Sequence, residues 1–354
     1  MRRSTGLLAL AGLLALSGCQ ADSAASVQAD YRAAQPFANS DSTAKHIGLL
    51  GSEDVRFEAE RGLMDLSRQY FPPSDVAFRT HTFLDFDELD ATDGSRGLLG
   101  TLRDDNPNGL NPNNNEAFDT GNGVVQGAII LVDIYEVDWY KGDTLAGISL
   151  GLVVNDTLSQ NGEEHKIGDE QLRSYIEVTS SKLVTYMRER FNEVSSRVPI
   201  LTAAYRLDTS EAASNGGYVM EGWFAQGAAQ GKFTAVKETN VTVPSAQFTA
   251  DAPELAQEFT TFKDDVRSVL SNNTYVTGTC RLLNNEPSRL DLTITTHGKM
   301  LSEVMAAAQA VENSFGTFTD TDVEYHVTII NNDEPYALGH RLSQSKELKM
   351  VTAG

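Results

Sequence analysis

The sequence predicts an α+β fold of antiparallel-rich sheets, with helices packed on one face of each sheet. Three observations predict it: β-type segments come in pairs joined by short turns, helical segments separate the pairs, and the same order recurs in the second half of the chain. Strands joined by tight turns pair antiparallel, and helices cover their apolar face. The recurrence predicts an internally duplicated helix-strand-strand-helix-strand-strand unit; two unrelated α+β domains are the alternative.

The first half of the chain contains the longer version of this unit. From Val55 onward, apolar residues recur mostly at spacings of three and four, and Pro72-Pro73 ends that helical pattern. Runs of β-type residues follow, then a long amphipathic stretch and two more strands. In order, we expect a helix at about 53–70, strands at 128–140 and 147–154, a helix at about 169–194, and strands at 199–207 and 218–225.

The second half repeats this order over fewer residues. Its helical stretch begins at Ala252-Pro253-Glu254, and Asn284-Asn285-Glu286-Pro287 is expected to form the turn of its first strand pair. In order, we expect a helix at about 252–271, strands at 275–283 and 289–296, a helix at about 299–314, and strands at 322–330 and 336–342.

Composition divides the chain into four segments. Residues 1–18 are typical of an export signal, and residues 19–50, rich in Ala, Ser, Asp and Gln without a sustained period, indicate a flexible tether. The two α+β domains are expected at 51–245 and 246–354.

The first nineteen residues have the features of a bacterial lipoprotein signal. Met1-Arg2-Arg3 is cationic, and the apolar run at 6–16 is too short, at about 1.5 Å per residue, to cross roughly 30 Å of hydrocarbon. Leu16-Ser17-Gly18-Cys19 resembles the lipobox, in which small residues admit the peptidase and the thiol takes the diacylglyceryl group. We expect cleavage between Gly18 and Cys19; a standard signal peptide with an incidental cysteine is the alternative.

Lipid on Cys19 would determine where the protein resides. Two acyl chains give stable anchoring where a single chain does not. The expected partners are therefore the membrane, through the lipid on Cys19, and the lipoprotein-processing enzymes. The expected location is therefore extracytoplasmic, with the lipid holding the protein to the membrane.

Composition also limits the possible functions. The chain has 354 residues and a formal net charge of −21, a surface that repels phosphate backbones and excludes a nucleic-acid partner. Its six histidines are scattered, with no HExxH and no close pair, so we expect no metal site. No phosphate-binding loop, dinucleotide fingerprint or nucleophile elbow occurs, so we expect no cofactor and no enzymatic activity.

A few residues outside such motifs are still candidates for chemistry. Cys280 lies in an apolar β-type run and is expected to be a buried free thiol rather than a nucleophile. Four arginines could clamp an anion or form surface ion pairs: Arg96, Arg103, Arg206 and Arg341.

The segment at 103–123 is expected to be an ordered loop without regular structure, because it is dense in Asn, Gly and Pro. Asp104, Asn106, Asn108 and Gly109 match the first half of a calcium-binding loop, but Asn115 stands where a bidentate Glu is needed. We expect Leu110 to anchor the loop in the core. A solvated turn and a calcium site are the two interpretations.

A series of short motifs runs along about residues 30–345. They are Tyr31-Arg32, Pro36-Phe37, Phe57-Glu58, Gly62-Leu63-Met64-Asp65-Leu66-Ser67, Tyr70-Phe71-Pro72, Phe83-Leu84-Asp85, Gly109-Leu110-Asn111-Pro112, Ile134-Tyr135-Glu136-Val137-Asp138-Trp139-Tyr140, Gly147-Ile148-Ser149-Leu150-Gly151-Leu152, Val198-Pro199-Ile200 and Ala204-Tyr205. Their order and spacing resemble the CamS family, sex-pheromone precursor lipoproteins of Gram-positive bacteria. The resemblance implies an α+β lipoprotein on the outer face of the cell membrane and brings no catalytic residues.

The resemblance also implies a role for the signal peptide. In the family, the released signal peptide is trimmed to a short apolar peptide that stimulates conjugative plasmid transfer from other cells. Carried onto this sequence, that peptide is Gly12-Leu13-Leu14-Ala15-Leu16-Ser17-Gly18, which departs from the family's Ala-Ile-Phe start.

The role of the folded body stays open at this point. An extracytoplasmic binding module for a cell-wall fragment or cation would show a pocket lined by aromatics such as Tyr140, Tyr205 and Trp223. An unrecognised enzyme would bring titratable groups together in one cleft.

Overall fold

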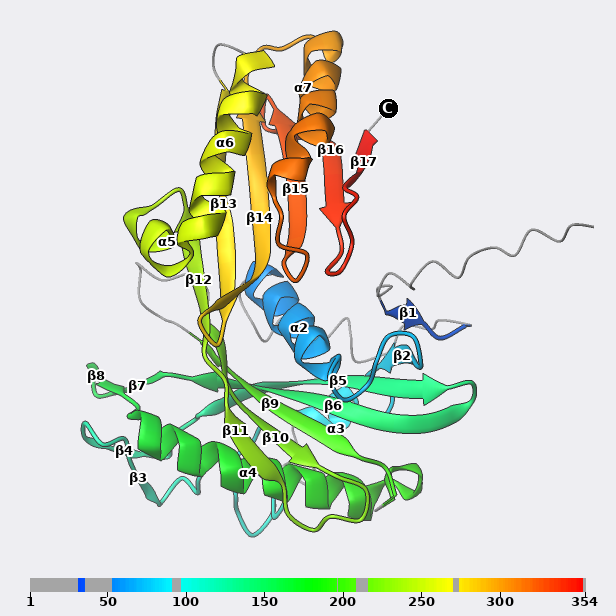
Figure 1. Cartoon of the computed structure of the whole chain (residues 1–354). Coiled ribbons are helices and arrows are strands. Elements are labelled where there is room, and N and C mark those ends of the chain that lie inside the picture. Colours follow the sequence, from blue (N-terminus) through cyan, green and yellow to red (C-terminus); the bar gives the residue numbers. More distant parts are fainter. Residues whose placement is uncertain are drawn as a thin grey trace, which may run out of the picture.

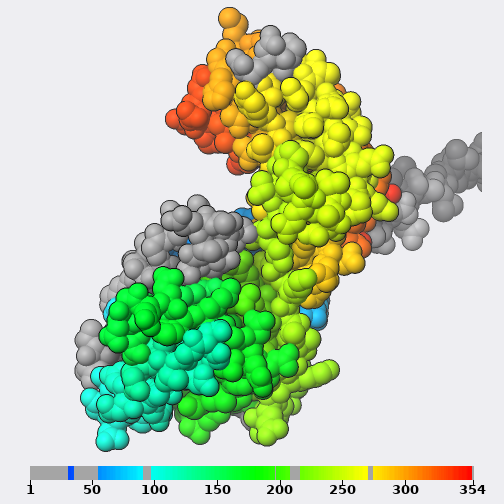
Figure 2. Space-filling view, turned by 90° about the vertical axis from the view of Figure 1, so that its left-hand side faces the viewer, coloured from blue at the N-terminus to red at the C-terminus, as the bar shows by residue number. Residues whose placement is uncertain are grey.

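The protein is described by a computed structural model at residues 31–35, 53–90, 97–195, 197–207, 216–269 and 274–352. The signal segment 1–18, with Gly12 to Gly18, lies outside the described residues, as do Cys19 and most of the tether at 19–50. Two large sheets organise the described chain (Figure 1). In the space-filling view they form two lobes, green for the first and yellow to red for the second (Figure 2).

The first sheet has seven strands in the order β1-β2-β5-β6-β9-β10-β11. The β1–β2 and β6–β9 pairs are parallel, and the other pairs are antiparallel. The strands are β1 (Arg32–Ala33), β2 (Ala77–Thr80), β5 (Leu131–Lys141), β6 (Thr144–Asn155), β9 (Ile200–Leu207), β10 (Gly217–Phe224) and β11 (Lys232–Ala235). Two small hairpins flank it: β3 (Ala117–Asp119) with β4 (Val124–Gln126), and β7 (Thr157–Gln160) with β8 (Glu163–Lys166).

The second sheet has six strands in the order β12-β13-β14-β15-β16-β17. Only its β14–β15 pair is parallel among these described strands. The strands are β12 (Glu238–Val243), β13 (Thr274–Leu283), β14 (Glu286–Thr296), β15 (Glu324–Asn331), β16 (Glu334–Arg341) and β17 (Lys349–Thr352).

The two sheets share one topology. From β2 to β11 and from β12 to β17, neighbouring strands follow the same series: antiparallel, antiparallel, parallel, antiparallel, antiparallel. In each sheet a helix bridges the parallel pair, α4 (Asp169–Arg190) in the first and α7 (Leu301–Ser314) in the second. The predicted α+β class and the repeated strand order are therefore confirmed.

The helices do not cover only one face of the first sheet, which corrects the prediction. On β9, Ile200 and Ala204 pack in the core that contains α4, whereas Leu201, Ala203 and Tyr205 pack in the core that contains α2 (Glu53–Ser67). Helices α2 and α4 thus lie on opposite faces (Figure 1). The reason is visible in β5 and β6, in which residues of both sheet faces are buried almost without interruption.

The second sheet keeps its helices on one face, as predicted. Helices α6 (Pro253–Val269) and α7 share one core with the inward residues of β13 to β15, and the short helices α5 (Ala246–Asp251) and η2 (Phe315–Thr317) complete that layer. Strand β15 alternates strictly, with Tyr325, Val327 and Ile329 buried. Its other residues face the side without helices.

Several predicted boundaries move. Strand β12 pairs with β13, so the change of sheet falls between Ala235 and Glu238 and precedes the expected boundary at 245/246. The loop at 103–123 contains β3, which pairs with β4 because Thr120 and Gly123 close a tight turn. The other expected helices and strands coincide with α2, α4, α6, α7 and the central strands; the edge strands, β7, β8, α5 and the short α3 (Phe86–Leu89) are additions.

Helix α2 lies between the two sheets and is bound to both (Figure 1). Arg281 of β13 is buried and forms ion pairs with Asp65 of α2 (2.5 Å) and with Glu238 of β12 (2.7 Å). On its other side, Gly62 lets α2 lie close to β10 of the first sheet, since a Cβ there would lie 2.5 Å from the ring of Tyr218. The second lobe is therefore attached to the first through α2 as well as through the chain at 236–237.

Candidate functional site

The open face of the second sheet carries a cluster of two histidines and a glutamate. Glu324 and His326 stand two residues apart on β15 and so project from the same face. His340 lies directly opposite His326 on β16. Each of the three side chains offers one possible metal-ligand atom, and these three atoms all lie within 4.8 Å of one another. Among the described residues, no other group of three histidine, cysteine or carboxylate side chains meets this criterion.

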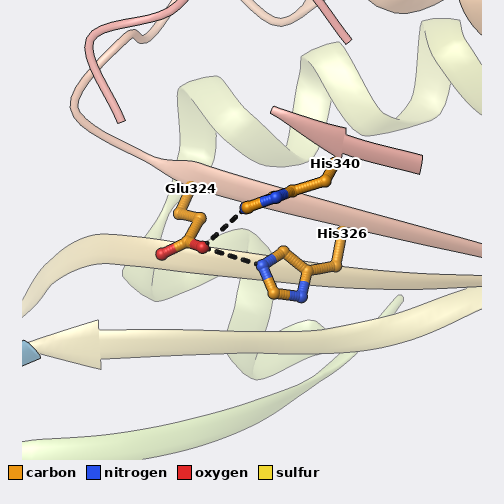
Figure 3. A group of neighbouring side chains, drawn as sticks. All are labelled: Glu324, His326 and His340. Atoms are coloured by element: carbon orange, nitrogen blue, oxygen red, sulfur yellow. Dashed lines mark hydrogen bonds and ion pairs between the residues drawn. The ribbon is translucent and has the colours of Figure 1, made fainter. Parts of the chain in front are cut away.

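Both imidazoles are directed at one oxygen of the carboxylate (Figure 3). His326 Nε2 lies 2.9 Å and His340 Nε2 lies 2.8 Å from Oε1 of Glu324. Burial acts to raise the pKa of Glu324, but the hydrogen bonds and charges of the two imidazoles outweigh burial and hold it well below its usual range. Glu324 is therefore a carboxylate at neutral pH.

A β-bulge produces this arrangement. Asn332 and Asp333, both with positive φ, form the two-residue turn between β15 and β16, and the first pairs beyond it are Asn331 with Glu334 and Ile330 with Pro335. Continued without a break, that register would place His326 opposite Gly339. The extra residue at Tyr336 shifts the register by one, so His340 faces His326 instead of turning to the covered face.

A second layer of charged side chains adjoins the cluster on β14. Asp291 Oδ1 lies 3.4 Å from His326 Nδ1, and Asp291 Oδ2 accepts a hydrogen bond of 2.9 Å from Nε of Arg289. Arg289 is almost fully buried, so its position is fixed. This chain of contacts orients His326 with Nδ1 toward Asp291 and Nε2 toward Glu324.

The cluster forms one wall of a cleft of about 350 Å³ between the lobes. The opposite side comes from α2, through side chains that include Glu60 and Arg61, and from Arg68 just beyond the end of α2. His340 remains 39% exposed and His326 28%, whereas Glu324 is 15% exposed. The imidazoles are thus accessible from the cleft while the carboxylate that binds them is held firmly.

The histidines show what the sequence could not reveal. The expectation of no close pair holds along the chain, but strand pairing brings His326 and His340 to a ring distance of 4.6 Å. The other described histidines lie elsewhere: His81 contacts the Leu84 carbonyl, His165 contacts Asn122, and His297 is exposed after β14. His46 is outside the described residues. The expectation of no metal site stays a prediction.

The remaining candidates do not converge. Arg103 and Arg206 form exposed ion pairs with Asp105 and Asp169, and Arg341 is buried, donating to the carbonyls of Phe318 and Asp320. Arg96 is outside the described residues.

The three expected aromatics do not line a common pocket. Tyr205 is in the core against Tyr218, and Trp223 stacks on Tyr70 at 4.3 Å. Tyr140 lies under Arg79 beside a different cleft.

Cys280 is a buried free thiol, as predicted. Burial, together with the Asp291 carboxylate, raises its pKa to about 12. A nucleophilic cysteine needs the opposite shift.

The 103–123 loop is ordered around Leu110 and Asn111. Leu110 is 6% exposed, as the anchor prediction requires. The Asn111 side chain donates to the carbonyls of Leu99 and Leu131 and accepts from the amides of Ile130 and Leu131, so it binds distant rather than local backbone. The structure therefore confirms an anchored loop and corrects the partners of Asn111.

The calcium-like residues of this loop point in different directions. Asp104 is exposed, whereas Asn106 is buried and donates to the carbonyls of Gly97 and Thr101. Asn115 is exposed at the far end of the loop. The oxygen side chains that a calcium loop would turn inward are therefore not gathered around one point.

Many of the short motifs meet in the layer between α2 and the first sheet. Tyr31 donates to the Phe71 carbonyl and packs on Trp139 at a ring distance of 4.2 Å. Ser149 accepts hydrogen bonds from Trp139 and Ser67. These residues support the packing of α2 on the first sheet.

The structure defines a class: a two-lobed α+β protein with a duplicated sheet topology and a helix of the first lobe placed between the sheets. The sequence profile described as CamS sex pheromone cAM373 precursor matches residues 40–347. The chain belongs to the CamS family.

Solved structures agree with this assignment at the level of the fold. A sex pheromone precursor from Lactobacillus salivarius is 20% identical, with 92% of this chain and 97% of that chain covered and a TM-score of 0.74. The C-terminal domain of the sex pheromone staph-cAM373 precursor from Staphylococcus aureus is 19% identical, with 84% and 96% covered and a TM-score of 0.68. No curated protein sequence matches the chain.

None of the described helices is both long and apolar enough to cross a bilayer.

Proposed function

We propose that this chain is the precursor of a membrane-anchored bacterial surface lipoprotein whose signal peptide yields a sex-pheromone peptide. Signal cleavage between Gly18 and Cys19 leaves Cys19 as the lipid-bearing N-terminus on the outer face of the cell membrane. Lipoprotein-processing enzymes act on the signal, and trimming releases the peptide from Gly12 to Gly18, which promotes conjugative plasmid transfer.

One observation carries the proposal: a cationic start, a short apolar run, a small-residue pair and Cys19 follow in order at the start of a chain from a pheromone-precursor family. We further propose that the folded body is not an enzyme. One candidate nucleophile at least is unsuited to that role, because burial raises the pKa of the Cys280 thiol, the reverse of nucleophile activation.

The anchor is tested by replacing the lipid-accepting thiol. We expect the wild-type chain, produced in a Gram-positive host, to enter the detergent phase at its processed size. Cys19→Ser should leave uncleaved or unlipidated protein, so that no chain of processed size enters the detergent phase. Cys280→Ser, which alters the other cysteine, is the matched control and should behave as wild type. A Cys19→Ser chain that still enters the detergent phase at processed size would contradict the anchor.

The peptide is tested separately. Mass spectrometry of culture supernatant should find a peptide ending at Gly18, and this peptide should disappear in the Cys19→Ser strain. A synthetic Gly-Leu-Leu-Ala-Leu-Ser-Gly peptide should raise plasmid transfer from responsive donor cells, and a scrambled peptide of the same composition should not. If the peptide is detected but does not raise plasmid transfer, the signal is processed as proposed and the peptide is not a pheromone.

A further inference from the structure

We propose that Glu324, His326 and His340 form a binding site for a divalent transition metal, Zn²⁺ in preference to Ca²⁺ or Mg²⁺, which opens into the cleft between the lobes. The site belongs to the folded body and does not depend on the proposed signal-peptide function. It assigns a class of ligand, a divalent transition metal, to the folded body.

The donor set selects the class of metal. Two imidazole nitrogens and one carboxylate oxygen suit borderline-soft cations such as Zn²⁺, whereas Ca²⁺ and Mg²⁺ prefer oxygen ligands throughout. Three protein ligands leave at least one coordination position for water or a bound group. Since the imidazoles remain partly exposed to the cleft, that position is accessible.

The distances fit a bound ion with small side-chain adjustments. Zn–N and Zn–O bonds of about 2.0–2.2 Å place two ligand atoms of a tetrahedral ion about 3.4 Å apart. The two Nε2–Oε1 distances are 2.9 and 2.8 Å, and no pair of the three ligand atoms is separated by more than 4.8 Å. A metal would replace the hydrogen bonds between the imidazoles and Glu324, with changes of about 1 Å that side-chain rotation can supply.

The surroundings resemble those of a prepared site. Asp291 is placed to fix the orientation of the His326 ring through Nδ1, the outer contact that metal-bound histidines usually make, and Arg289 holds Asp291 in turn. The ligands stand on β15 and β16 inside a sheet, which restricts their positions. The bulge at Tyr336 is the feature that turns His340 to this face, and such bulges often re-aim a side chain next to a functional site.

Titration of ZnCl₂ into the full chain, purified in detergent and stripped of metal with EDTA, tests the site. We expect one ion per chain by calorimetry at pH 7.5. His326→Ala and His340→Ala should each weaken binding by about 100-fold or more. Asp291→Asn should weaken it by about 10-fold, within the range for outer contacts of metal ligands. His297→Ala, an exposed histidine of the same lobe, is the control and should bind as wild type.

Three results would overturn the site: no binding, equal binding to wild type and to both ligand variants, or CaCl₂ binding with the same dependence on His326 and His340. Thermal unfolding should confirm that each variant folds. Co²⁺ added to the unaltered chain provides a readout that needs no variant. We expect the intense visible absorption of a four- or five-coordinate ion, and the weak bands of an octahedral aqua ion would exclude the site.

Discussion

The first sheet is enclosed by α4 on one face and α2 on the other, whereas the second sheet, with the same strand order, has helices on one face only. On the face opposite the crossover helix, β9 carries Leu201, Ala203 and Tyr205, and β15 carries Glu324, His326 and Thr328. Equal topology therefore does not require equal surfaces. The face that α2 covers in the first lobe is apolar, and the face left open in the second lobe is polar.

The difference extends to the segment beside the crossover helix. In the second lobe α6 packs beside α7, whereas in the first lobe the loop around Leu110 packs beside α4, where Tyr175 donates to the Leu110 carbonyl. The loop thus fills the place that α6 takes in the second lobe. Helix α2 lies between the sheets and forms the opposite wall of the cleft (Figure 1).

The largest expected effect concerns the contact that holds α2 to both lobes. Arg281→Ala leaves the buried carboxylate of Glu238 without its partner and releases Asp65, so we expect a loss of about 3–5 kcal/mol in the free energy of unfolding. Chemical denaturation measures it. Arg206→Ala, which removes an ion pair with a solvent-exposed aspartate, is the control and should cost less than about 1 kcal/mol. Equal losses in the two variants would show that α2 is not held by Arg281.

How far the sequence predicted the fold follows from the same comparison. The apolar spacing at 53–70 predicted α2 but not which sheet face it would cover, because amphipathicity shows that a helix buries one side and not against what. The nearly continuous apolar run of β6, set against the strict alternation of β15, was the available signal for two covered faces against one.

The candidate site was beyond the sequence for a different reason. His326 and His340 face each other only because the register shifts by one residue at the bulge, and a two-residue turn read from the sequence predicts the unshifted pairing. The proline at 335 beside a strand start was a hint, since prolines within sheets favour edges and bulges.

A pair of substitutions tests the contrast between the covered and the open face. Leu201→Ala removes a fully buried side chain from the layer under α2, so we expect a loss of about 2–5 kcal/mol in unfolding free energy. Thr328→Ala, on the open face of the second sheet, should cost less than about 1 kcal/mol because its side chain is only half-buried. Urea denaturation of both variants measures the difference. A similar cost at both positions would mean that the second sheet is covered on this face as well.

In the first lobe the 103–123 loop packs where the second lobe has α6, and the position of this loop depends on Asn111. Asn111→Ala leaves the buried amides of Ile130 and Leu131 without an acceptor, and we expect a loss of about 1–3 kcal/mol. Asn115→Ala, in an exposed part of the same loop, should stay within about 0.5 kcal/mol of wild type. Hydrogen exchange should locate the weakening at the start of β5. Unchanged exchange there would indicate that Leu110 alone anchors the loop.

The smallest expected effect belongs to the calcium interpretation of the same loop. Asp104 is exposed and the Asn106 amide is committed to the carbonyls of Gly97 and Thr101, so the oxygens that calcium would need are not aimed at one another. We therefore expect CaCl₂ to produce no heat of binding in calorimetry, and Asp104→Ala to change the free energy of unfolding by less than about 0.5 kcal/mol. Heat of binding that vanishes in Asp104→Ala would overturn the structural interpretation, because it would require the loop to rearrange around an ion. If the heat of CaCl₂ binding persists in Asp104→Ala, calcium binds elsewhere on this acidic chain. The loop would then keep its structural role as the counterpart of α6.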